Sequence, residues 1–98
     1  MSKIGISDIR RRSYPIFNNA GFIKRVFLFG SYARGEEKDN SDLDFLVELN
    51  DDVGLEFFGL YDRLQDEFHM RVDVITEDEA KRIMGTRPKK EGVLIYER

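Results

Sequence analysis

The sequence predicts an α/β (α+β) domain built around a mixed β-sheet. Three apolar segments have the length of strands, namely Arg25–Phe29, Asp42–Leu49 and Arg71–Thr76. We take the first two to be antiparallel neighbours, so that the first strand ends where the second begins. The third follows a helical segment of about 16 residues, the usual crossover to a parallel neighbour. Together the two kinds of pairing make the expected sheet mixed.

The length and charge of the chain limit the number of its domains and the kinds of partner that it can bind. Its 98 residues correspond to a single domain, residues 1–98. It carries 16 basic and 19 acidic residues, a net charge of −3. Stable binding to nucleic acid is not expected, because that needs a basic face. One bound nucleotide whose charge is met by Mg²⁺ remains compatible with this balance.

The composition also restricts the environment of the protein. The chain contains no cysteine, which excludes disulfides and thiolate metal sites. No apolar run approaches the roughly 18 residues of a membrane span. The N-terminus lacks the apolar stretch of a signal peptide. A cytoplasmic protein is therefore expected.

The first helix is expected to begin with Ser7 as its cap and to end at Gly21. Pro15 lies inside this pattern, and it either kinks the helix or starts a second short turn. The face predicted to be buried carries Ile9, Ser13, Ile16 and Phe17. The strand Arg25–Phe29 that follows is expected to be buried, because its apolar residues are nearly continuous.

Residues 30–35 are expected to form a turn and a short helix, and residues 36–41 a loop. A second long helix is expected after Asp51 or Asp52, either of which can cap it. The residues Phe57 and Phe58 cannot both face the core, so one ring is expected to be exposed. The predicted core stripe consists of Phe57, Leu60, Tyr61, Leu64 and Phe68.

A third helix is expected from the capping residue Thr76, in a Thr-Glu-Asp-Glu capping box, to Gly85. The pattern leaves open whether Val93–Tyr96 is a strand or a helical turn.

A phosphate cradle is predicted where the strand Arg25–Phe29 runs into Gly30-Ser31. A helix that starts there would direct unpaired backbone N–H groups at an anion. Gly30 allows close approach of a phosphate because it has no Cβ. Ser31 can donate a hydrogen bond to a phosphate oxygen, and Arg34 can meet remaining charge as a planar donor.

Three carboxylates are expected at the same end of the sheet. Asp42 and Asp44 share one face of their strand, because strand side chains alternate, and Asp73 lies early in the third strand. Oxygen ligands of this kind suit Mg²⁺, and two such ions can act together on an in-line displacement. The residues therefore predict metal ligands at Asp42, Asp44 and Asp73, with Asp73 also able to accept the proton of an attacking hydroxyl.

Simpler interpretations exist for each of these residues. Asp42 and Asp44 alone could be solvated acids at a strand end, and Ser31 alone could be a helix cap. Arg34 could equally form a surface ion pair of little energetic value. His69, the only histidine, is expected to be an exposed helix cap and not a metal ligand. The catalytic interpretation depends on the combination of residue types and spacing.

The combination resembles the DNA polymerase β-type nucleotidyltransferase superfamily. The segments that carry the resemblance are GSYARG at 30–35, SDLDFLV at 41–47 and VDVI at 72–75. Within the superfamily the chain is similar to the minimal nucleotidyltransferases, the antitoxins paired with HEPN toxins. The resemblance implies a mixed sheet with helices packed on one face.

The resemblance also implies a reaction. AMP would pass from ATP, with two Mg²⁺ ions, to a tyrosine hydroxyl of a partner HEPN RNase, which the modification silences. Asp42, Asp44 and Asp73 would be the catalytic metal ligands, and Gly30 and Ser31 would contact the nucleotide. The chain would then act as an antitoxin in a hetero-oligomer with that toxin. Two alternatives stay open: a non-catalytic antitoxin that acts by binding, and a nucleotidyltransferase acting on a small molecule.

Overall fold

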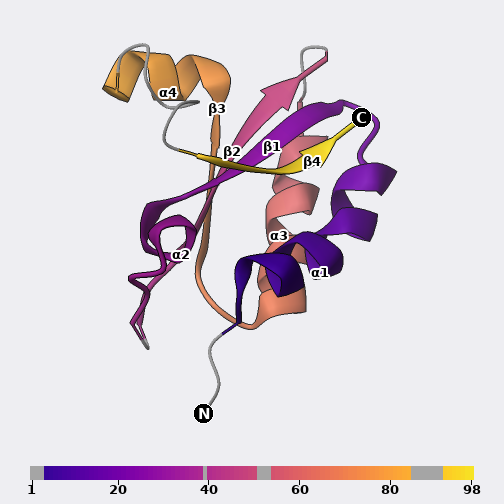
Figure 1. Cartoon of the computed structure of the whole chain (residues 1–98). Coiled ribbons are helices and arrows are strands. Elements are labelled where there is room, and N and C mark those ends of the chain that lie inside the picture. Colours follow the sequence, from indigo (N-terminus) through magenta and orange to yellow (C-terminus); the bar gives the residue numbers. More distant parts are fainter. Residues whose placement is uncertain (1–3, 39, 51–53, 85–91) are drawn as a thin grey trace.

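The computed structural model describes residues 4–38, 40–50, 54–84 and 92–98. Its elements, shown in Figure 1, are α1 (Ile6–Asn19), β1 (Ile23–Phe29), α2 (Gly30–Arg34), β2 (Leu43–Leu49), α3 (Glu56–Phe68), β3 (Val72–Thr76), α4 (Glu77–Met84) and β4 (Val93–Glu97). None of the helices in these ranges combines the length and apolar character of a membrane span.

The four strands form one mixed sheet in the order β3-β2-β1-β4. β1 is antiparallel to β2, and β2 is parallel to β3, so both predicted pairings are confirmed. β4 is antiparallel to the other edge of β1, which answers the question left open for Val93–Tyr96. Helix α3 makes the crossover from β2 to β3, as expected for a parallel pair.

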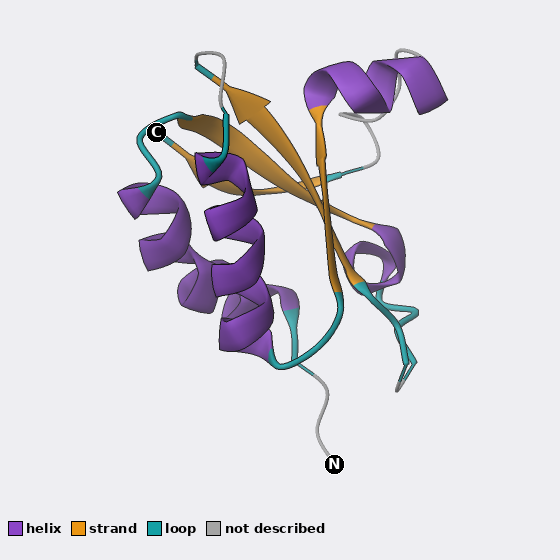
Figure 2. Cartoon of the chain, turned by 180° about the vertical axis from the view of Figure 1, so that it is seen from behind, coloured by secondary structure: helices purple, strands orange, loops and turns teal. Residues whose placement is uncertain are grey.

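Helices α1 and α3 cover one face of the sheet, as Figure 2 shows. The core between these layers is formed by alternate strand residues and by one stripe of each helix, including the predicted α3 stripe. Phe58 is 66% exposed while Phe57 packs against this core, so the prediction that one ring would be exposed is confirmed. The opposite face carries a smaller cluster, in which Ala80 of α4 packs on Phe27 and Leu46.

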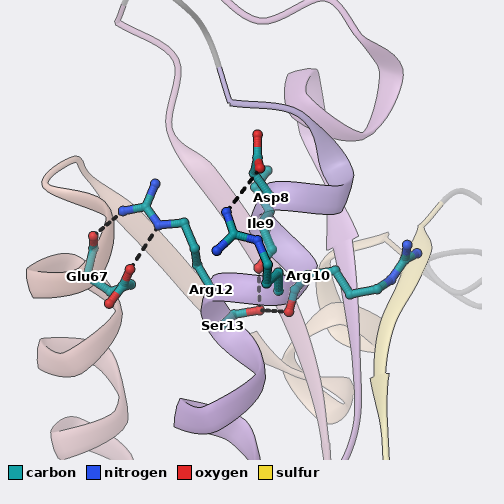
Figure 3. A network of polar contacts seen from close by, with 7 residues as sticks. Asp8, Ile9, Arg10, Arg12, Ser13 and Glu67 are labelled. Atoms are coloured by element: carbon teal, nitrogen blue, oxygen red, sulfur yellow. Dashed lines mark hydrogen bonds and ion pairs between the residues drawn. The ribbon is translucent and has the colours of Figure 1, made fainter.

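A polar clamp joins the two covering helices (Figure 3). Arg12 of α1 donates from Nε to Glu67 Oε2 at 2.8 Å and from a second nitrogen to the Glu67 carbonyl. The same guanidinium lies 4.7 Å from the centre of the Phe68 ring. Ser13, buried in α1, satisfies its hydroxyl by donating to the Ile9 carbonyl at 2.6 Å. The clamp ties α1 to the C-terminal end of α3.

Several predicted helix boundaries were wrong. Helix α1 begins at Ile6 with Gly5 at the cap, so Ser7 lies inside the first turn. It ends at Asn19 with Ala20 as the C-cap, and it runs through Pro15 as one helix. The first N–H and last C=O groups of a helix have no partner within the helix, and the rest of the fold decides which groups bond them. A local residue pattern therefore does not reveal the exact end of a helix.

The later boundaries are mixed in outcome. Leu55 stands at the cap of α3, while the predicted capping residues Asp51 and Asp52 lie outside the described residues. Thr76 caps α4 as predicted, accepting from the Glu79 N–H at 3.2 Å. Gly85, predicted to close that helix, lies outside the described residues.

Candidate active site

Gly30 joins β1 to α2 in a conformation that only glycine adopts easily. Its φ is +74°, in the left-handed region. A Cβ at this position would lie 2.2 Å from Oδ2 of Asp44, inside van der Waals contact. The chain therefore needs glycine here for two independent reasons. Gly35, with φ +72°, ends α2 and donates its N–H to the Ser31 carbonyl.

Three residues form one lateral row across the sheet. Phe29 of β1 is the register partner of Asp44 in β2, and Asp44 is the partner of Asp73 in β3. Register partners direct their side chains to the same face. Strand alternation places this row on the face opposite α1 and α3, because Leu43, Phe45, Val72 and Val74 occupy the core.

The row borders a pocket of about 270 Å³ beside α2. Four of its lining residues are Gly30, Arg34, Asp44 and Asp73. The apolar part of the lining consists of Phe29, Phe45, Leu46 and Ile75. A larger hollow of about 380 Å³ lies between α1 and α3, and its lining contains none of the predicted site residues.

The environment of Asp44 disfavours the charged form of its carboxyl group. Partial burial raises the pKa of the Asp44 carboxyl above its usual value of 3.8, and the charges of Asp73 and Asp42 raise it further. Arg34 opposes this shift. An acid with a raised pKa beside two other acids has an unfavourable charged form, which a bound cation would stabilise.

Two of the three predicted ligands line the pocket, and the third lies near enough for its charge to act on Asp44. Asp44 and Asp73 lie side by side at the pocket, whereas Asp42 precedes β2 and its Oδ1 lies 3.7 Å from Arg71 Nε. The predicted start of this strand at Asp42 was thus one residue early. Within the described ranges, no three acidic or histidine side chains are grouped as a metal site. The oxygen donors of Asp44 and Asp73 and the excess negative charge nevertheless fit a hard divalent cation.

The predicted phosphate contacts lie on α2. Ser31 is half-buried at its first turn. Arg34 borders the pocket, and its Nε donates to Glu36 Oε1 at 2.8 Å with both side chains largely exposed. The surface ion pair of Arg34 is thus observed, at one edge of the guanidinium, and the phosphate contact stays a prediction. His69 is exposed at the C-cap of α3, as predicted.

Sequence reasoning missed the apolar half of the pocket. Phe29, Leu46 and Ile75 follow the ordinary pattern of buried strand residues, and only their position beside Asp44 and Asp73 gives them a place in a site. The register of the three strands carries the missing information.

The chain matches the family model for the polymerase β nucleotidyltransferase domain over residues 14–98. In this chain Gly30-Ser31 follow β1, and Asp44 and Asp73 lie on β2 and β3. The chain belongs to the polymerase β nucleotidyltransferase family.

Two relatives in Methanocaldococcus jannaschii are named as protein adenylyltransferases. One is 35% identical over 91 residues, covering 92% of this chain and 97% of the relative. The other is 44% identical over 74 residues, covering 74% of this chain and 86% of the relative. The enzymatic class, a nucleotidyltransferase, follows from the family and from these relatives.

Two solved structures share the fold. One, described as a minimal nucleotidyltransferase, is 26% identical with a TM-score of 0.76 and matches 95% of this chain and 98% of its own. The other is a complex of a tri-AMPylated Shewanella oneidensis HEPN toxin with its MNT antitoxin, 16% identical with a TM-score of 0.72 over 95% of this chain and 73% of that one. The mixed-sheet fold predicted from the sequence is confirmed.

Proposed function

We propose that this chain is a Mg²⁺-dependent protein adenylyltransferase that modifies a tyrosine of a HEPN RNase partner and so acts as its antitoxin. The observation that carries the proposal is the convergence of Gly30, Asp44, Asp73 and Arg34 on one pocket in a member of this family. The relatives named as protein adenylyltransferases favour a protein acceptor. The AMPylated complex with the same fold favours a HEPN partner.

Each residue has a role that its position supports. Gly30 admits the triphosphate against the backbone, because no Cβ stands between the turn and Asp44. Ser31 hydrogen-bonds a phosphate oxygen, and Arg34 offers the guanidinium nitrogens that do not contact Glu36. Asp44 and Asp73, with Asp42 if it leaves Arg71, hold Mg²⁺. When bound, the metal neutralises phosphate charge and stabilises the pyrophosphate leaving group.

The reaction is an in-line displacement at the α-phosphorus of ATP. The tyrosine oxygen forms a bond to this phosphorus, and the bond from phosphorus to the bridging oxygen of pyrophosphate breaks. Asp73 accepts the proton of the tyrosine hydroxyl, since it lies at the pocket next to Asp44. The protein contributes mostly positioning and charge stabilisation, as in other phosphoryl transfers.

A direct experiment combines the chain with the product of its neighbouring gene. The two proteins are purified together, incubated with ATP and Mg²⁺, and weighed by intact-mass spectrometry. The proposal predicts that the partner gains one or more AMP units. If Asp44→Asn abolishes this gain yet still protects cells from the partner, the chain is an antitoxin that acts by binding. If only a small molecule is modified, the acceptor has been assigned wrongly.

A further inference from the structure

The apolar half of the pocket has no assigned role in the proposed reaction. Phe29 stands at the end of β1, half-buried, directly before Gly30 and directly opposite Asp44. In the row across the sheet Asp44 thus has a carboxylate on one side and an aromatic ring on the other. A nucleoside triphosphate has a matching division, with a charged phosphate chain at one end and a flat apolar base at the other.

The ring of Phe29 lies close to Gly92, the residue that precedes β4. A Cβ on Gly92 would lie 2.2 Å from Cε1 of Phe29 and 2.8 Å from its Cζ. Gly92 directly precedes Val93, whose register partner is Leu28, so it stands beside Phe29 on the side away from Asp44. The missing side chain of Gly92 provides the space that the ring occupies.

We propose that the Phe29 ring is the wall on which the base of the nucleotide packs, and that Gly92 positions this ring by leaving room for it over β4. The inference rests on the proposed function, because it takes the pocket to be the ATP site. Leu46 and Ile75 complete the apolar side, and Asp44 and Asp73 remain on the phosphate side. An aromatic ring can stack on any base, because every base has a flat π-face. The Phe29 ring would therefore add affinity for the nucleotide without selecting one base over another.

Gly92 acts only through Phe29. With alanine at position 92, the far end of the ring must move, because a contact of 2.2 Å is impossible. Because Gly92 stands on the side of Phe29 away from Asp44, we expect a ring displaced from the new methyl group to move toward Asp44 and the pocket. Gly92→Ala is therefore expected to narrow the pocket where the base would enter.

The test compares two ligands, Mg·ATP and Mg·tripolyphosphate, by calorimetric titration of each purified variant. Phe29→Ala, and Phe29→Leu as a milder variant, are expected to weaken Mg·ATP binding by about tenfold. Both should leave tripolyphosphate binding unchanged. Gly92→Ala is expected to weaken ATP binding similarly, and to have no further effect in the Phe29→Ala background. If Phe29 and Gly92 had only a structural role, their substitution would lower the affinities for ATP and for tripolyphosphate together.

Two results would overturn the inference. One is ATP affinity that stays at the wild-type value in both Phe29 variants. The other is loss of ATP and tripolyphosphate affinity in equal measure in folded Gly92→Ala protein. Failure of the wild-type chain to bind either ligand would be a different result, since it would reject the pocket as a nucleotide site and the proposed function with it.

Discussion

Asp44 and Asp73 are register partners in the parallel pair β2–β3, so two carboxylates stand directly opposite each other on one face of the sheet. Like charges in this relationship destabilise a sheet. The two carboxylates lie in the same pocket as Gly30, where the backbone turns, and as Arg34. The relationship is thus better explained by a cation and a polyphosphate than by the stability of the protein.

The first prediction concerns the stability cost of Asp44. Its pKa is raised in the folded chain, so folding favours the protonated form. The contribution of Asp44 to the free energy of unfolding is therefore fully present below the usual carboxyl pKa. It is lost as the pH rises through the raised pKa of Asp44 in the folded chain. At pH 7 with a chelator, Asp44→Asn is expected to melt a few degrees above the wild type. The difference should vanish near pH 3 in thermal melts followed by circular dichroism.

The second prediction adds the metal. Mg²⁺ together with a non-hydrolysable ATP analogue should raise the melting temperature of the wild-type chain, because a ligand of the native state stabilises it. Asp44→Asn should show little of this increase. Asp62→Asn, in the exposed part of α3, is the matched control and should respond as the wild type does. An equal increase in all three proteins would mean that the ligand binds elsewhere.

The third prediction separates two effects of Gly30. Gly30→Ala introduces backbone strain at φ +74° and a clash with Asp44, whereas Gly35→Ala introduces the same strain with nothing within 4 Å of the new Cβ. Gly35→Ala should lose about 1–2 kcal/mol in urea unfolding, and Gly30→Ala at least as much because of the added clash. Only Gly30→Ala should abolish AMP transfer to the partner. Loss of transfer in folded Gly35→Ala would show that strain, and not the clash, accounts for the effect.

The fourth prediction concerns the buried charge at the far end of the same face. Glu48 is 4% exposed, and its Oε1 lies 3.3 Å from Arg25 Nε. Arg25→Met removes this ion pair from a buried carboxylate and should destabilise the chain by about 2 kcal/mol in urea unfolding, less than for a fully buried pair because Arg25 is partly exposed. Arg25→Met/Glu48→Leu should regain much of this loss. A double variant less stable than the single one would contradict this account of the pair.

The fifth prediction concerns the cap of α4. Thr76→Ala removes the acceptor for the Glu79 N–H and is expected to cost about 1 kcal/mol. Thr76→Ser keeps the hydroxyl and should stay close to the wild type in the same urea titration. Equal losses in both variants would assign the effect to the methyl group of Thr76 and not to the cap.

The sequence predicts the sheet well because apolar runs and crossover length determine strand pairing. Arg25–Phe29 and Asp42–Leu49 pair as expected, and Asp73 reaches the same face as Asp44 because both strands alternate in register. The strand at Val93–Glu97 could not be assigned, because a short apolar run suits a helical turn equally well. Only its pairing with β1 decides the matter.

The residues of the candidate site that have chemically distinctive side chains, or none, could be predicted from the sequence. Those that belong to the site only through their neighbours in the fold could not. Gly30, Asp44 and Asp73 are unusual at their positions and therefore informative. Phe29 resembles any core residue, and Gly92 resembles any loop glycine, until the ring of one is seen to lie over the other. The ion pair of Asp42 with Arg71 likewise depends on a contact between the residues that precede β2 and β3, which no local pattern contains.

The central claim is that Asp44 and Asp73 serve adenylyl transfer to a partner protein. It is tested most directly by incubating the co-purified pair with Mg²⁺ and ATP labelled at either the α- or the γ-phosphorus. The account predicts label on the partner from α-labelled ATP alone, and none with Asp44→Asn or Asp73→Asn. Label arriving from the γ-position, or undiminished transfer by both variants, would contradict it.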